Sequence, residues 1–197
     1  MTFVLPTAVL VAVLVRVHER PAAFIAKPLA SAGFVLIALS EGATGSAYGR
    51  IILAGLILGA LGDVALMFDR WFLAGLVLFA AGHVAYIFAF IANGPIALST
   101  AAVGAALCLG SAVWLLPRVD SSMRVPVAVY IVVISVMVSV GLGAEQPAFV
   151  RIGAPLFALS DLLVARERFL VSDARNRMWG LPMYYTAQVL IALSVAR

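Results

Sequence analysis

Residues 49–68 read GRIILAGLILGALGDVALMF, and residues 71–92 read WFLAGLVLFAAGHVAYIFAFIA. Each run is close to the roughly 20 apolar residues that a helix needs to cross a bilayer. The break between the two runs is Asp69-Arg70, a charged pair of the kind expected at a membrane surface. The two runs therefore predict a pair of consecutive transmembrane helices, and one carboxylate, Asp63, lies inside the first of them.

The rest of the chain has the same character. Hydrophobic residues make up 64% of its 197 residues and charged residues 11%, whereas soluble domains are about 45–50% apolar and about 25% charged. The excess is spread over the whole length, which leaves no room for a soluble domain. We therefore expect a single transmembrane domain over residues 1–197 that binds membrane lipids and no nucleic acid.

Apolar runs bounded by charge, glycine or proline predict an all-α, polytopic bundle of eight transmembrane helices. The second helix is expected to start at Lys27-Pro28, since proline fits the first turn of a helix, where its missing N–H would be unpaired anyway. The eight expected spans are residues 2–17, 28–41, 49–68, 71–92, 97–117, 125–144, 148–166 and 179–196.

Lysine and arginine sort to one side of this bundle. Ten of the thirteen lie in the loops that follow the odd-numbered helices, and only Arg50, Arg151 and Arg197 lie on the opposite side. Basic residues concentrate in cytoplasmic loops, so both termini are predicted outside. The ten are Arg16, Arg20, Lys27, Arg70, Arg118, Arg124, Arg166, Arg168, Arg175 and Arg177.

A shift of 98 residues brings polar and proline positions of the two halves into register. Asp63 then falls on Asp161, and its neighbours follow the same shift: Pro28 on Pro126, Arg70 on Arg168, Gly82 on Gly180 and Tyr86 on Tyr184. An even number of helices in each half makes the repeats parallel. The pattern suggests two related four-helix halves, residues 1–98 and 99–197.

Asp63 and Asp161 are the carboxylates that lie inside apolar runs, where a charge costs several kcal/mol and marks a functional site. Both are predicted at similar depth near the cytoplasmic ends of their helices, and other helices carry polar groups in the same half of the membrane: His83, Tyr86, Tyr130, Ser160, Tyr184, Tyr185 and Gln188. We expect one polar cavity that opens toward the cytoplasm and extends as an apolar space toward the bilayer centre.

Each of these residues also has a purely structural interpretation. His83 and Gln188 could join helices by hydrogen bonds, and Tyr130 and Tyr184 could belong to the interfacial aromatic belt. Lys27 could either extend to the surface or bind a phosphate. Asp69, Arg70, Glu167 and Arg168 are most simply solvated loop charges. Two histidines and one cysteine give no metal-ligand spacing, and the elbow of serine hydrolases and the Walker loop are absent, so carboxylate chemistry without a cofactor remains.

At these residues the chain resembles the YhhN-like family of integral membrane proteins, which includes the lysoplasmalogenases. The resemblance is carried by Lys27-Pro28, Gly62-Asp63, Gly82-His83-x-x-Tyr86, Tyr130, Ser160-Asp161 and Tyr184-Tyr185-x-x-Gln188. It implies eight helices, two essential aspartates at Asp63 and Asp161, and a multi-pass protein such as those of a bacterial inner membrane. It also implies an enzyme that hydrolyses the vinyl ether bond of lysoplasmalogen, or of a related ether lysolipid, into a fatty aldehyde and a glycerophospho-base.

The residues suit that chemistry. Protonation of a vinyl ether carbon yields an oxocarbenium ion that water attacks, as in glycosidases, and requires one carboxylic acid and one carboxylate. Lys27, His83, Tyr86, Tyr130, Ser160, Tyr184, Tyr185 and Gln188 would bind or orient the lysophospholipid and water. Which aspartate is the acid stays open. A proton-coupled transporter of lipids or small molecules is the alternative, and a structural membrane protein is a third.

Overall fold

The computed structural model describes residues 3–17, 22–171 and 173–196, and the regular structure of these residues is helical. The α-helices are α1 (Val4–Val17), α2 (Ala23–Ser40), α3 (Ala47–Ala65), α4 (Phe72–Ile91), α5 (Leu98–Leu115), α6 (Ser121–Gly141), α7 (Ala148–Phe169) and α8 (Ala174–Leu193). Short 3-10 turns, η1 (Ala43–Gly45), η2 (Asp69–Trp71) and η3 (Leu116–Arg118), lie between them. This confirms the predicted all-α bundle and its element order.

Three predicted helix starts are too late, those of α2, α6 and α8, and the start of α2 is the informative one. The second helix begins at Ala23, five residues before the expected Pro28, and Pro28 lies inside it. The N–H groups of the first helical turn have no partner within the helix. Pro28 follows this turn directly, so the helix loses a single hydrogen bond, the one that an N–H at position 28 would donate to the carbonyl of Phe24. The extra turn carries Lys27 into the helix.

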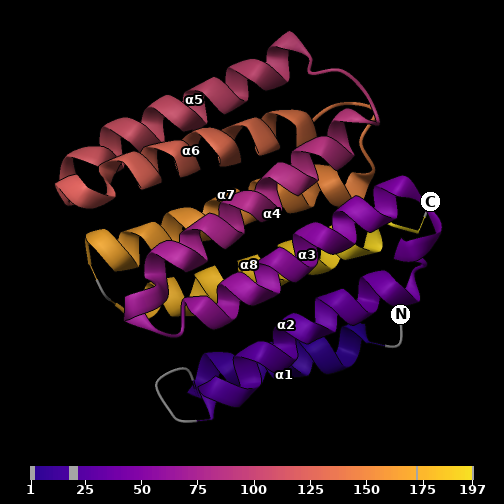
Figure 1. Ribbon diagram of the computed structural model, residues 1–197, viewed down its shortest axis with the longest axis horizontal. Helices are drawn as coiled ribbons and strands as arrows, with labels where there is room; N and C mark the ends of the chain where they lie inside the picture. The colour runs from indigo at the N-terminus through magenta and orange to yellow at the C-terminus, as the bar shows by residue number, and fades with distance from the viewer. Residues whose placement is uncertain (1–2, 18–21, 172, 197) are drawn as a thin grey trace.

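The helices run up and down along one axis (Figure 1). The start of α1 and the end of α8 lie at one end of the bundle, and the end of each odd-numbered helix lies at the other, beside the start of the helix that follows it (Figure 1). This arrangement brings Arg16, Lys27, Arg70, Arg118, Arg124, Arg166 and Arg168 to a common end, here called the basic end. Among the basic residues sorted above, Arg20 and Arg197 lie outside the described residues, as do the side chains of Arg175 and Arg177.

Close packing of α3 on α4 fixes the centre of the bundle. A Cβ on Gly82 would lie 3.1 Å from the carbonyl oxygen of Gly55 on α3, and a Cβ on Gly55 would lie 2.4 Å from the ring of Tyr86 on α4. Small residues that let helix backbones approach are a common feature of membrane helix contacts. The Gly55-x-x-x-Gly59 pattern therefore lies at a helix interface.

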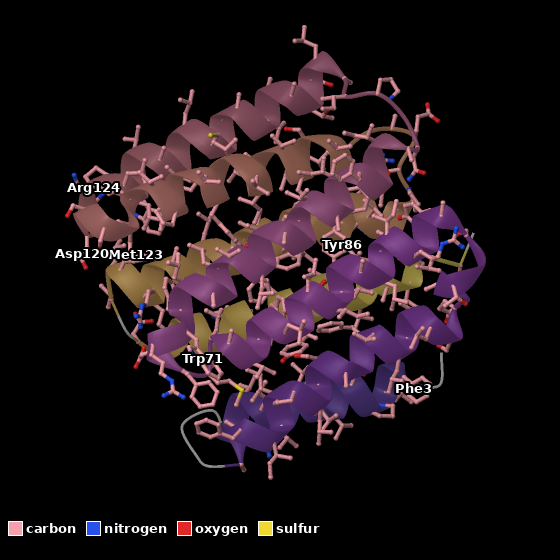
Figure 2. The ribbon with its side chains drawn as sticks, viewed as in Figure 1. Phe3, Trp71, Tyr86, Asp120, Met123 and Arg124 are labelled. Carbon is pink, nitrogen blue, oxygen red and sulfur yellow. The ribbon has the colours of Figure 1, made fainter. Side chains whose placement is uncertain are left out.

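The bundle is a multi-pass integral membrane protein. Six helices of the described part, α2 to α7, are long and apolar enough to cross a bilayer. The end helices are less regular spans, since α1 has only 14 residues and α8 begins with a polar turn. Figure 2 shows Tyr86 about midway along the bundle, with Trp71 and Arg124 toward the basic end and Phe3 toward the other.

The two halves have corresponding contacts. The helices α2 and α6 begin 98 residues apart, and each carries its proline five residues further on. Within each half consecutive helices pack together, and α4 packs on α6 as α8 packs on α2. Some contacts lack an equal counterpart: α1 packs on α8, whereas α5 packs on α6 and is set apart from α4 (Figure 1), and α3 packs more closely on α8 than α7 packs on α4. The related halves remain a prediction that these correspondences support.

Candidate active site

A cavity of about 550 Å³ lies between the two halves near the basic end. Its apolar wall comes mainly from α4, α5, α6 and α7, and it reaches the surface beside the exposed Asp69. The polar and charged residues that line it are Lys27, Asp63, Asp69, Ser111, Tyr130, Ser160, Asp161, Glu167, Arg168 and Tyr184. Both intramembrane aspartates therefore face one space.

Asp63, on the last full turn of α3, is almost completely enclosed, with 3% of its side chain exposed. Lys27 Nζ lies 3.3 Å from its Oδ1. Ser31 and Tyr184 donate hydrogen bonds to its Oδ2, each at 2.6 Å. A buried carboxylate persists where a cation and hydrogen-bond donors satisfy it, and Asp63 has both.

A chain of hydrogen bonds behind the cavity aims the hydroxyl of Tyr184 at Asp63. Tyr86 donates to Gln188 Oε1 at 2.8 Å, and Gln188 Nε2 donates to the Tyr184 hydroxyl oxygen at 3.2 Å. Because Tyr184 accepts from Gln188, its own proton is directed to Asp63. All these side chains are buried, so the orientation is fixed by packing as well.

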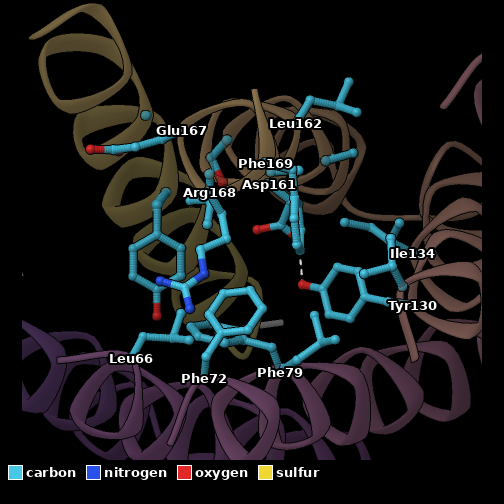
Figure 3. A pocket seen from close by; sticks show the side chains of 18 of the residues that line it. Leu66, Phe72, Phe79, Tyr130, Ile134, Asp161, Leu162, Glu167, Arg168 and Phe169 are labelled. Carbon is cyan, nitrogen blue, oxygen red and sulfur yellow. Dashed lines mark hydrogen bonds between the residues drawn. The ribbon is translucent and has the colours of Figure 1, made fainter. Parts of the chain in front are cut away.

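Asp161, on α7, has a different environment. Its Oδ2 accepts a hydrogen bond from Tyr130 at 2.5 Å and lies 3.2 Å from His83 Nε2. Its Oδ1 has no hydrogen-bond partner among the described residues, and 17% of the side chain is exposed. Figure 3 shows Asp161 and Tyr130 facing each other, joined by this bond. Asp161 is therefore the more accessible carboxyl group of the pair.

The proton of His83 can be assigned from its neighbours. Nε2 lies 2.9 Å from the Tyr130 hydroxyl, whose proton goes to Asp161, so Nε2 must be the donor. Nδ1 is buried without a hydrogen-bond partner. His83 thus braces Tyr130 and Asp161 through Nε2.

The structure separates the residues predicted from the sequence into two layers. Lys27, Asp63, Tyr130, Ser160, Asp161 and Tyr184 line the cavity. His83, Tyr86, Tyr185 and Gln188 lie behind its wall and reach it only through hydrogen bonds. This second layer can position the first, but it has no direct access to the cavity.

Some residues at the site were not identified from the sequence. Ser31, which donates to Asp63 and lies 3.2 Å from the Tyr185 hydroxyl, was missed because a serine in an apolar helix carries no distinctive signal. Asp69, Glu167 and Arg168, interpreted as solvated loop charges, line the outer end of the cavity. Within the described residues, no group of three or more His, Cys, Asp or Glu side chains is placed to hold a metal ion.

Fold and site together define a polytopic helical membrane protein with two aspartates in one largely apolar cavity. The sequence model that describes the YhhN family matches residues 22–195, and the chain therefore belongs to that family. The predicted resemblance is thereby confirmed.

Two similar curated proteins are lysoplasmalogenases. That of Mycobacterium bovis is 32% identical over 156 residues, which cover 72% of this chain and 59% of the relative. Lysoplasmalogenase TMEM86B of Homo sapiens is 31% identical over 173 residues, which cover 86% of this chain and 72% of the relative. The chain therefore spans about three fifths of the length of its mycobacterial relative. No solved structure matches the chain.

Proposed function

We propose that this protein hydrolyses the vinyl ether bond of lysoplasmalogen or a closely related ether lysolipid. The observation that carries the proposal is that Asp63 and Asp161 line one cavity whose wall is otherwise largely apolar. An alkenyl chain needs such a wall, and vinyl ether hydrolysis needs two carboxyl groups in different protonation states. The similarity to lysoplasmalogenases supplies the substrate class.

The surroundings of the two aspartates suggest a division of labour. Asp161 has an oxygen without a protein partner and no lysine or arginine beside it among the described residues, so we assign it as the proton donor. Asp63 is held by Lys27, Ser31 and Tyr184 and has little exposure, so we assign it as the carboxylate that stabilises positive charge across the cavity.

The reaction then proceeds in balanced steps. The Asp161 carboxyl proton moves to the vinyl carbon remote from the ether oxygen, the double bond supplies the electron pair, and an oxocarbenium ion forms. Water attacks the carbon next to the oxygen and returns a proton to the Asp161 carboxylate, giving a hemiacetal. The Asp161 carboxyl group then protonates the ether oxygen, the bond between this oxygen and the hemiacetal carbon breaks, and the hemiacetal hydroxyl returns its proton to the carboxylate. A fatty aldehyde and a glycerophospho-base are released, with one water consumed.

Other residues would prepare these steps. Tyr130, held by His83, keeps the second oxygen of Asp161 occupied and so leaves Oδ1 directed to the substrate. The apolar wall around Leu107, Ile131 and Ile134 would hold the alkenyl chain. By the distribution of basic residues, the basic end with the cavity mouth would face the cytoplasm.

The test is aldehyde release from lysoplasmalogen by the purified protein. Asp63→Asn and Asp161→Asn should each abolish it while the protein stays folded, whereas the matched change Asp120→Asn, in an exposed connection away from the cavity, should leave it unchanged. Full activity in either active-site variant would refute the proposal. Proton-coupled uptake of a solute by the wild-type protein, without hydrolysis of lysoplasmalogen, would instead favour the alternative function, a proton-coupled transporter.

A further inference from the structure

Arg168 occupies the mouth of the cavity. Its guanidinium lies 2.6 Å from Asp69 Oδ1, an ion pair that joins the end of α7 to the α3–α4 connection. The guanidinium carbon also lies 4.4 Å from the ring centre of Phe72, which packs edge-to-face on Phe169. Figure 3 shows Arg168 beside Phe72, on the side of the cavity where Glu167 turns outward.

The cavity needs a cation for the phosphate of a lysolipid, and Lys27 is not free to serve. The Lys27 ammonium is engaged by Asp63, and only 14% of that side chain is exposed. Arg168, by contrast, is 39% exposed and shares the same cavity. A guanidinium also matches phosphate oxygens through two parallel hydrogen bonds, which an ammonium cannot do.

Building on the proposed function, we propose that Arg168 binds the phosphate of the lysolipid headgroup, with Asp69 as the partner that the phosphate displaces. Arg168 lies seven residues after Asp161 on the same helix, so the two share one face about 10 Å apart along the axis. The glycerol that links ether oxygen to phosphate fits between them.

Exchange of Asp69 for phosphate is favoured by exposure and charge. Asp69 is 90% exposed, so its carboxylate regains water when it leaves Arg168. Exposed ion pairs contribute little to stability. The phosphate of a bound lysolipid is linked to a hydrocarbon chain that already occupies the cavity. Its contact with Arg168 is therefore intramolecular within the complex, and its effective concentration at Arg168 is high. The stacked Phe72 keeps the guanidinium in place during the exchange.

The experiment measures equilibrium binding, which does not require turnover. The ligands are a saturated alkyl ether lysophospholipid, which cannot be hydrolysed at a vinyl ether, and the matching alkyl glycerol without phosphate. Arg168→Ala should weaken binding of the lysophospholipid by about tenfold to a hundredfold, as for loss of a charged hydrogen-bond partner. Binding of the alkyl glycerol should not change. Equal effects on both ligands, or no effect on the lysophospholipid, would overturn the proposal.

Further arms separate the remaining explanations. Arg70→Ala is the matched control, since Arg70 stacks on Trp71 at the same end but does not line the cavity. Asp69→Asn should tighten lysophospholipid binding by up to about fivefold; weakening comparable to that of Arg168→Ala would make the ion pair a structural clasp and overturn the proposal. Inorganic phosphate that displaces the lysolipid at equal concentration would assign the site to free phosphate. Absence of aldehyde release would refute the proposed function and leave these binding outcomes readable.

Discussion

Removal of the Lys27 ammonium should destabilise the protein through Asp63. At an effective dielectric constant of about 20, unit charges separated by the 3.3 Å between Lys27 Nζ and Asp63 Oδ1 attract by about 5 kcal/mol. Most of that attraction offsets the desolvation of the two groups. A single Lys27→Met change removes the attraction and leaves the desolvated carboxylate behind, so we expect a loss of about 3–5 kcal/mol in the free energy of unfolding.

The combined variant distinguishes this explanation from simple loss of packing. Asp63→Asn in the Lys27→Met background removes the stranded charge, so it should recover most of the loss and give a coupling energy of at least about 2 kcal/mol. Unfolding by sodium dodecyl sulfate in mixed micelles, followed by helical circular dichroism, measures each free energy. Arg50→Met, in an exposed position at the opposite end, is the control and should change it by less than about 0.5 kcal/mol. If the double variant is no more stable than Lys27→Met, the pair does not act as argued.

Three further changes test the cavity and the packing around it. Tyr130→Phe removes the donor to Asp161 and should lower kcat for aldehyde release by about tenfold to a hundredfold with little change in KM; an unchanged kcat would contradict the positioning role. Leu107→Trp, in the apolar wall, should raise KM for long alkenyl chains and spare short ones in a chain-length series; equal effects on both would contradict the assigned path of the chain. Gly82→Ala would place a Cβ 3.1 Å from the α3 backbone and should cost about 1–3 kcal/mol in the same unfolding assay, whereas Gly110→Ala, with open space around it, should be close to neutral.

Much of the fold was predictable because the bilayer imposes a minimum length on each apolar run. The charged breaks at Asp69-Arg70 and at Arg118 to Asp120 divide the chain where the helices end. The start of α2 was not predictable in this way, since Pro28 is compatible with the first turn and, at the cost of one hydrogen bond, with the second. The residues before Pro28 decide it: Ala23 to Lys27 form a first turn that reaches Asp63.

The sequence predicted which residues belong to the site better than it predicted which of them contact each other. A carboxylate in an apolar helix is costly enough to be recognised in sequence, which identified Asp63 and Asp161. The partners of the two aspartates depend on how each helix is rotated about its own axis. The spacing of polar and apolar residues does not specify this rotation when a helix is apolar on all sides. Hence the pairing of Lys27 with Asp63, the contribution of Ser31 and the place of Arg168 at the cavity mouth followed only from the packed structure.

The difference between the two aspartates can be traced to positions where the halves depart from each other. Each aspartate is contacted by a hydrogen-bonding side chain from α2 or α6 and by one from α8 or α4. These helices correspond under the 98-residue shift, but the contacting residues themselves do not. The position 98 residues after Lys27 is Val125, which is exposed, so α6 brings no cation to Asp161.

Packing adds a second difference between the halves. The helix α1 packs on α8, whereas α5 is set apart from α4, and of the two aspartates that line the cavity Asp161 is the more exposed. If the halves arose by duplication, loss of one cation and one helix contact would suffice to turn two equivalent carboxylates into a fixed charge and an accessible acid.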